Sequence, residues 1–259
     1  MKGTKLMTDQ LEKANIFRDL HENGETFIIP NPWDAGSAQL LEKVGFKALA
    51  TTSSGFAHSI GKVDGQVSLD EKLAHCRNLV AATNIPISAD FEDGFAADPK
   101  EAAANLIKLA ATGVVGGSIE DYSRTEIYDF DLAVDRVAAC AEAARSLSFP
   151  FTLTARAEGV LRGVGDLDAA MERIQAFEAV GADVLYIPGL RTLAEVDIVV
   201  NGVSKPVNVL APFMPDTTLA DYTAHGVGRI SIGGALADHA VAATRDAATN
   251  MLATGSFAM

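Results

Sequence analysis

The sequence lacks the features that define membrane, secreted or disulfide-linked proteins. Its 259 residues include two cysteines, Cys76 and Cys140, which lie in helical, alanine-rich stretches and which we expect to be buried, reduced thiols. No apolar run approaches the roughly 20 residues of a membrane span, and the first residues lack the apolar core of a signal peptide. We therefore expect a cytoplasmic protein with no membrane partner.

Positive charge is also scarce, with 21 Lys and Arg against 34 Asp and Glu and a formal net charge of −13. A surface this negative repels phosphate backbones, so we expect no nucleic-acid partner. A negatively charged protein that binds a negatively charged metabolite needs positive charge at the binding site. A metal ion and a few buried arginines would supply it.

Short apolar runs and amphipathic stretches alternate along the whole chain. The apolar runs predict eight strands, at 27–31, 48–52, 86–90, 114–120, 151–156, 184–188, 207–211 and 229–233. The amphipathic stretches predict helices near 35–44, 69–83, 99–112, 131–147, 167–180, 191–201, 217–225 and 235–254. Near-continuous apolar strands that alternate with helices indicate a parallel sheet. Eight such units in about 250 residues fit one (β/α)8-barrel domain over residues 1–259 better than a doubly wound sheet. No Gly-x-Gly-x-x-Gly follows the first strand, which counts against the dinucleotide-binding alternative.

Acidic residues gather where two neighbouring strands end, which is where such barrels carry their active sites. Asp90 and Glu92 end the third predicted strand, and Glu120 and Asp121 end the fourth. Like charges this close repel one another, so something positive should compensate them. Hard oxygen ligands without Cys or His point to Mg²⁺ or Mn²⁺. The alternative is that these acids are solvated loop residues or helix caps.

The other strand ends carry polar and aromatic side chains. Arg156 could hold a substrate carboxylate in bidentate fashion, or simply balance Glu120. The turn at 53–56, Ser-Ser-Gly-Phe, could cradle an anion with its N–H groups, although such turns are common. Trp33, the only tryptophan, could equally line a pocket or plug the barrel. None of the five histidines ends a strand, so we expect neither a His-based triad nor a zinc site.

Several segments, taken together and in order, resemble the isocitrate lyase / phosphoenolpyruvate mutase superfamily over nearly the whole chain. They lie at 31–38, 52–55, 61–65, 89–94, 119–121, 155–158, 206–209 and 229–233. The resemblance implies a (β/α)8 barrel, often with the last helix exchanged between the subunits of a homodimer or homotetramer. It also implies a small carboxylic acid as substrate and Mg²⁺, with Mn²⁺ as the alternative, as cofactor.

The resemblance also implies roles for individual residues. Asp90 matches the principal metal ligand, and Asp64, Glu92 and Glu120 match outer ligands that act through metal-bound water. Arg156 would steady a developing enolate or the leaving group, so Arg156, Asp64 and Glu120 are the expected catalytic residues. The expected substrate-binding residues follow the first, second, fifth and seventh strands and are Trp33, Ser53, Ser54, Gly55, Phe56, Arg156 and Asn208.

The loop after Glu120-Asp121 departs from the superfamily pattern. Isocitrate and methylisocitrate lyases carry Lys-Lys-Cys-Gly-His there, with the cysteine as acid. Phosphonopyruvate-acting members carry a lysine directly after the Glu-Asp pair and an asparagine further on. Here the loop at 122–129 reads Tyr-Ser-Arg-Thr-Glu-Ile-Tyr-Asp. The residues that match the metal-binding and 2-oxo-acid-binding part of the site are therefore present. The loop residues that supply the acid or base in the known members are absent.

The expected reaction is cleavage of a carbon–carbon bond in a small 2-oxo or 2-hydroxy di- or tricarboxylic acid through a metal-stabilised enolate. Oxaloacetate decarboxylation fits best, because it needs no base to remove a proton first; Tyr122, Tyr128 or water could supply the final proton. A retro-aldol or retro-Claisen lyase, a phosphonopyruvate or carboxyphosphonate mutase or hydrolase, and a non-catalytic 2-oxo-acid-binding protein are the alternatives. A Mg²⁺-dependent 2-oxo acid aldolase ranks low, because those barrels hold metal with acids from later strands.

Overall fold

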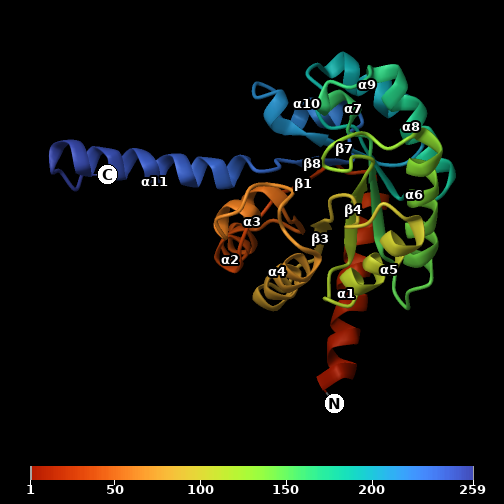
Figure 1. The fold of residues 1–259 in the computed structure, drawn as a ribbon, viewed down its shortest axis with the longest axis horizontal. Helices are drawn as coiled ribbons and strands as arrows, with labels where there is room; N and C mark the ends of the chain where they lie inside the picture. Colours follow the sequence, from red (N-terminus) through yellow and green to blue (C-terminus); the bar gives the residue numbers. More distant parts are fainter. Residues whose placement is uncertain (1, 259) are drawn as a thin grey trace.

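Eight parallel strands form the centre of the computed structural model, which describes residues 2–258 and, from Asp9 onward, their side chains (Figure 1). The strands are β1 (Phe27–Ile29), β2 (Leu49–Ala50), β3 (Ile87–Asp90), β4 (Gly116–Glu120), β5 (Thr152–Arg156), β6 (Val184–Tyr186), β7 (Val207–Leu210) and β8 (Arg229–Ser231). Their order in the sheet is β1-β8-β7-β6-β5-β4-β3-β2, so each strand from β2 to β8 pairs with its neighbours in that series, and β1 pairs with β8. The predicted (β/α)8 barrel is confirmed.

The seam between β1 and β2 is closed by side chains more than by a strand ladder. Ala50 N–H donates to the carbonyl of Pro30 at 3.0 Å. The amide nitrogen of Asn31 donates to the carbonyl of Thr51 at 3.1 Å, and its oxygen accepts from the N–H groups of residues 232–233, each at 2.9 Å. Asn31 thus ties together the ends of β1, β2 and β8.

The eight predicted helices are all present. They are α2 (Ala35–Val44), α4 (Leu69–Ala82), α5 (Pro99–Ala110), α6 (Phe130–Arg145), α8 (Leu167–Ala179), α9 (Leu193–Asn201), α10 (Leu219–Ala224) and α11 (Ala235–Thr254). The Asp98 carboxylate caps α5 by accepting from the N–H groups of Lys100 and Glu101. Gly45 ends α2 in the left-handed conformation, with φ 111°.

Four further elements were not predicted: α1 (Lys2–Glu22), α3 (Ser53–Ser59), α7 (Gly159–Arg162) and the 3₁₀ turn η1 (Ala211–Phe213). α3 corrects the expected Ser-Ser-Gly-Phe turn. The Thr52 hydroxyl accepts from Gly55 N–H at 3.3 Å and caps a helix that begins at Ser53. The segment therefore folds as the first turn of a helix instead of an open loop.

Helix α1 covers the amino-terminal end of the barrel (Figure 1). Its Ala14 and Phe17 are fully buried in a cluster with Ile29, Ala48 and Val115. The Gln10 amide fastens the helix to the neighbouring loop by donating to the carbonyls of residues 110 and 114 at 2.9 and 3.0 Å. The sequence pattern did not reveal this helix, because only a few widely spaced apolar residues of α1 enter the core.

Helix α11 occupies the eighth helical position but projects away from the barrel (Figure 1). Ala237 is its one buried residue, whereas Leu236 and Val241 are exposed at 36% and 38% and Leu252 at 92%. Apolar side chains on α11 are therefore left uncovered by the rest of this chain.

Two expectations drawn from composition can be compared with the structure. Cys76 and Cys140 are buried and unpaired, and burial raises the pKa of their thiols to about 11 and about 12. Among residues 2–258, no helix is both long enough and apolar enough to cross a membrane.

The packing of α1 predicts that Phe17→Ala will lower the free energy of unfolding by about 3–5 kcal/mol, because Phe17 is 0% exposed inside the barrel floor. Urea denaturation followed by circular dichroism measures this change. Ile16→Ala is the matched control, because Ile16 is 44% exposed on the same helix and should cost much less. Equal losses in the two variants would contradict the assigned packing of α1.

Candidate active site

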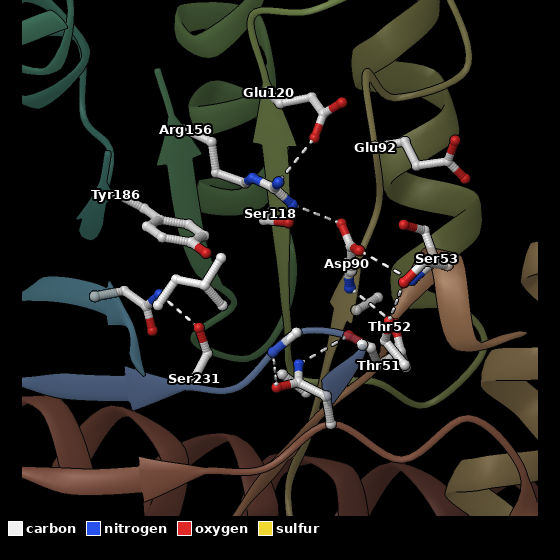
Figure 2. Close-up of a pocket in the computed structure, with 18 of the residues that line it drawn as sticks. Thr51, Thr52, Ser53, Asp90, Glu92, Ser118, Glu120, Arg156, Tyr186 and Ser231 are labelled. Atoms are coloured by element: carbon white, nitrogen blue, oxygen red, sulfur yellow. Dashed lines mark hydrogen bonds and ion pairs between the residues drawn. The ribbon is translucent and has the colours of Figure 1, made fainter. Parts of the chain in front are cut away.

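A cavity of about 370 Å³ opens where the carboxyl ends of the strands meet. Residues from β1 to β8 line it, together with the loops that follow β2 and β4 (Figure 2). Eight of the residues singled out in the sequence lie in its wall: Ser53, Ser54, Asp64, Asp90, Glu92, Glu120, Arg156 and Asn208.

The guanidinium of Arg156 is the centre of the charged network (Figure 2). Its Nη1 donates to Asp90 Oδ1 at 2.8 Å, and its Nη2 lies 3.2 Å from Glu120 Oε2. Nε and Nη2 both donate to Glu158 Oε1, at 2.9 and 2.7 Å. The β4–β5 register places Glu120 directly opposite Arg156, so the fold itself sets this contact. The positive charge that the acid cluster requires thus comes, at least in part, from Arg156.

Burial and charge shift the pKa values of the two acids beside Arg156 in opposite directions. Burial alone would raise the pKa of Asp90, but Arg156, Lys72 and the Ser53 N–H outweigh it and hold the pKa below its ordinary value. Burial raises the pKa of Glu120 well above its ordinary value, despite the attraction of Arg156. The pKa of Asp90 is therefore lowered and that of Glu120 raised, although both acids contact the same guanidinium.

A second buried cation lies behind Asp90. Lys72 on α4 is 0% exposed, and its Nζ donates to the Thr51 hydroxyl at 3.2 Å. The same hydroxyl oxygen accepts from Asp90 N–H at 2.9 Å, and Asp90 Oδ2 accepts from Ser53 N–H at 3.0 Å. The Asp90 carboxylate is thus held from two sides before any ligand binds. The sequence pattern did not signal Lys72, because it lies on a helix and not at a strand end.

Glu92 stands apart from the Arg156 network (Figure 2). Its Oε1 is buried without a hydrogen-bond partner, and burial raises its pKa to about 7. A buried carboxyl oxygen that lacks a donor is an acceptor available to a cation or a bound water.

The carboxylates do not form a compact cage. Within the described part of the chain, no three His, Cys, Asp or Glu side chains stand close enough to bind one ion directly. Asp64, for example, is exposed on the loop that follows α3. Mg²⁺ is usually held by one or two carboxylates and keeps several waters. The ionised Asp90 and the unpartnered oxygen of Glu92 fit such an ion better than they fit a metal that requires many protein ligands.

Three predicted substrate-binding residues lie outside the cavity wall: Trp33, Gly55 and Phe56. The N–H groups of Gly55 and Phe56 donate to the Thr52 hydroxyl and carbonyl, at 3.3 and 3.2 Å, and so cap α3. The Phe56 ring stacks on His75, with the ring centroids 3.8 Å apart. These N–H groups are therefore already engaged within the chain.

Asn208 lines the cavity, but its side-chain amide is occupied by neighbours. It donates to the Ser231 hydroxyl at 2.9 Å and accepts from Arg229 Nε at 2.8 Å. Asn208 is 1% exposed. Its visible role is to position Arg229 and Ser231.

Two neighbouring acids are turned away from the cavity and support the framework. Asp121 accepts from Glu158 N–H at 2.8 Å and from Arg173 Nη1 at 3.1 Å. Asp93 accepts from the Tyr128 hydroxyl at 3.1 Å, and burial raises the pKa of Tyr128 to about 12. Of the two tyrosines considered as proton donors, Tyr122 lines the cavity and Tyr128 does not.

Sequence reasoning missed three residues of the charged site. Glu158 follows Arg156 by two positions. Because alternate residues of an extended strand point to the same face, this spacing could have revealed Glu158 as a neighbour of Arg156. Tyr186 ends β6, and the Arg156 guanidinium lies 5.2 Å from the centroid of its ring. Arg229 is buried with the neutral partners Asn208, His21 and Thr154, and burial lowers its pKa to about 10.

Known proteins resemble this chain in sequence and in structure. The family model described as phosphoenolpyruvate phosphomutase matches residues 17–252. A Burkholderia cenocepacia J2315 protein, described as a candidate lyase or mutase, has a solved structure with a TM-score of 0.93 and 47% identity, covering 96% of this chain and 91% of that chain. An uncharacterized protein of Mycobacterium tuberculosis is 30% identical over 218 residues, which span 84% of this chain and 81% of that protein.

More distant relatives carry names that describe reactions. The oxaloacetate decarboxylase of Paraburkholderia xenovorans is 24% identical over 216 residues, covering 79% of this chain and 71% of that enzyme. A phosphonopyruvate hydrolase solved with oxalate and Mg²⁺ shares the fold, with a TM-score of 0.85 at 24% identity over 94% of this chain and 88% of that chain.

The family model spans most of the chain, and the superfamily motifs lie around one cavity. The chain therefore belongs to the phosphoenolpyruvate phosphomutase family, within the isocitrate lyase / phosphoenolpyruvate mutase superfamily.

Proposed function

We propose that the protein is a Mg²⁺-dependent carbon–carbon lyase that cleaves a small 2-oxo acid, with oxaloacetate decarboxylation as the reaction that suits it best. One observation carries the proposal: an ionised Asp90 and a permanently charged Arg156 face the same cavity, 2.8 Å apart. A site of this kind can hold a cation and an anion side by side. A 2-oxo acid bound together with a divalent ion presents that pair of charges.

The metal would be held directly by Asp90, with Asp64, Glu92 and Glu120 contributing through water. When bound, Mg²⁺ would supply Lewis-acid stabilisation of charge on the keto oxygen of the substrate. Mn²⁺ accepts similar oxygen ligands and is the alternative. The Mg²⁺ bound with oxalate in the phosphonopyruvate hydrolase structure supports this assignment through a shared fold.

Arg156 would donate hydrogen bonds to the oxygen on which negative charge develops. Its three carboxylate partners hold it in place, so little reorganisation is required when the charge appears. Ser53 and Ser54 line the wall beside Asp90 and could hold the substrate carboxylate through hydroxyl groups. The N–H groups of Gly55 and Phe56 could take part only if the cap of α3 opened.

Decarboxylation suits these residues because it requires no base to start the reaction. The Glu120 carboxyl, whose pKa burial raises, and the hydroxyl of Tyr122 are two groups in the cavity wall that could deliver the final proton. The Tyr122 hydroxyl donates to the carbonyl of Arg124 at 2.9 Å, so its proton is engaged until that loop moves.

The proposal predicts that purified protein with Mg²⁺ will release pyruvate from oxaloacetate faster than Mg²⁺ alone. Asp90→Asn should lower the enzymatic rate at least about 100-fold, because it removes the direct metal ligand, and should keep the fold. Asp121→Asn is the matched control: this acid adjoins Glu120 but faces Arg173, so its loss should affect stability more than turnover. A coupled assay for pyruvate measures both variants.

A wild-type rate equal to the metal-only background would contradict the decarboxylase assignment. If 2-oxo acids then raised the melting temperature in the presence of Mg²⁺, the non-catalytic binding protein would be the better account. Turnover of phosphonopyruvate instead of oxaloacetate would favour the mutase or hydrolase alternative.

The raised pKa of Glu92 predicts a pH dependence in metal-free protein. Because the pKa in the folded state is about 7 instead of 4.5, the stabilising contribution is fully present below pH 4.5 and is lost as pH rises through 7. The shift corresponds to about 3 kcal/mol at most. Glu92→Gln should flatten the loss between pH 4.5 and about 7, and Mg²⁺ should reduce the loss in wild type, as thermal denaturation can show. An unchanged slope in Glu92→Gln would contradict the assigned cause.

We also propose a homodimer or homotetramer, because α11 exposes apolar residues that the rest of this chain leaves uncovered. Exchange of α11 between subunits would bury them. Sedimentation equilibrium should therefore give a mass of two or four chains, and Leu236→Asp together with Val241→Asp should shift it toward one chain. A single-chain mass for the wild type would contradict the proposal.

A further inference from the structure

The loop between β4 and α6 places an arginine over the active-site cavity. Ser123 N–H donates to the carbonyl of Glu126, and Tyr128 N–H donates to that of Asp121, each at 2.8 Å. An antiparallel bridge joins Tyr122 to Ile127. The loop is therefore a short, hydrogen-bonded hairpin. Arg124 lies near its tip and lines the cavity.

Backbone strain is concentrated around this arginine. Among the described residues, three that are not glycine adopt a left-handed φ: Glu92 at 49°, Phe95 at 57° and Arg124 at 74°. Arg124 contacts the other two: its guanidinium carbon lies 5.1 Å from the centroid of the Phe95 ring, and its Nη2 lies 3.2 Å from Glu92 Oε2. Strained conformations of this kind persist where the surrounding structure holds them, and they cluster at ligand sites.

The guanidinium of Arg124 is only partly engaged within the chain. Its Nε and Nη2 are buried without a hydrogen-bond partner. Nη2 is near Glu92 Oε2, but the pair lacks the geometry of a hydrogen bond. Arg162, the other arginine at the cavity mouth, is engaged: its Nη2 lies 3.1 Å from Glu158 Oε2 and its guanidinium 4.2 Å from the Tyr122 ring. Arg124 is thus ion-paired with Glu92 and Asp93, yet its Nε and Nη2 donate no hydrogen bond to any described residue.

We propose that Arg124 is a specificity-determining residue that binds a second anionic group of the substrate. The inference rests on the proposed function, in which Asp90 and Arg156 hold the 2-oxo acid end at the strand ends. Arg124 lines the same cavity from the loop and its Nε has no partner in the chain, so the guanidinium fits a carboxylate at the other end of the ligand. The substrate is then a 2-oxo dicarboxylate, and a 2-oxo monocarboxylate is a poor one.

Calorimetric titration of two probes in the presence of Mg²⁺ tests this assignment. Oxalate carries the metal-binding end alone, and oxaloacetate difluorinated at its methylene carbon also carries the distal carboxylate. Arg124→Gln should weaken binding of the four-carbon probe about 10- to 100-fold and change oxalate affinity less than about two-fold. Arg124→Lys should recover part of the loss, because it keeps the charge without the planar fork. Arg77→Gln, an exposed arginine on α4, is the matched control and should change neither affinity.

The outcomes separate the two proposals. If wild type binds neither probe, the proposed function fails and the inference fails with it. If wild type binds both probes and Arg124→Gln weakens them equally or not at all, the role of Arg124 alone is overturned. Selective loss of the four-carbon probe, accompanied by a higher KM for oxaloacetate with a smaller change in kcat, supports the inference.

Discussion

The rest of the site depends on the ion-pair network of Arg156. One guanidinium contacts Asp90, Glu120 and Glu158, which come from β3, β4 and the end of β5. Removing one partner of a buried ion pair typically costs about 3–5 kcal/mol, because the other charge is left uncompensated. The ion-pair network therefore stabilises the fold as well as setting the charge of the site. It ties three strand ends together and keeps one acid ionised.

The same network explains how a protein with a net charge of −13 can receive an anionic ligand. Positive charge is placed inside the barrel, where Arg156, Arg229 and Lys72 are all largely buried, instead of on the surface. Arg229 and Lys72 have neutral hydrogen-bond partners, so their fields reach the cavity without being cancelled by a bonded carboxylate. Arg124 extends this pattern to the loop above the cavity.

The barrel could be predicted because its strands are apolar runs separated by capped helices, a signal that is local in sequence. The residues at strand ends were predictable for the same reason, since register brings Asp90, Glu120 and Arg156 to one edge. Lys72 and α1 were not, because their roles arise from tertiary contacts with Thr51 and the barrel floor. The Ser53–Phe56 segment was mistaken for an open turn, since a threonine cap decides whether such a segment becomes a helix. The sequence offered an ion pair between Arg156 and Glu120 as one interpretation, but it could not show that the same guanidinium would also contact Asp90 and Glu158.

The central claim is that Asp90 and Arg156 together hold a metal-bound 2-oxo acid at the strand ends. A crystal structure with Mg²⁺ and oxalate tests it most directly. The account predicts density for Mg²⁺ beside Asp90, with Glu92 reached through water and oxalate in hydrogen-bond contact with Arg156. Oxalate bound elsewhere, or Asp90 and Arg156 still paired only with each other at saturating Mg²⁺ and oxalate, would contradict it.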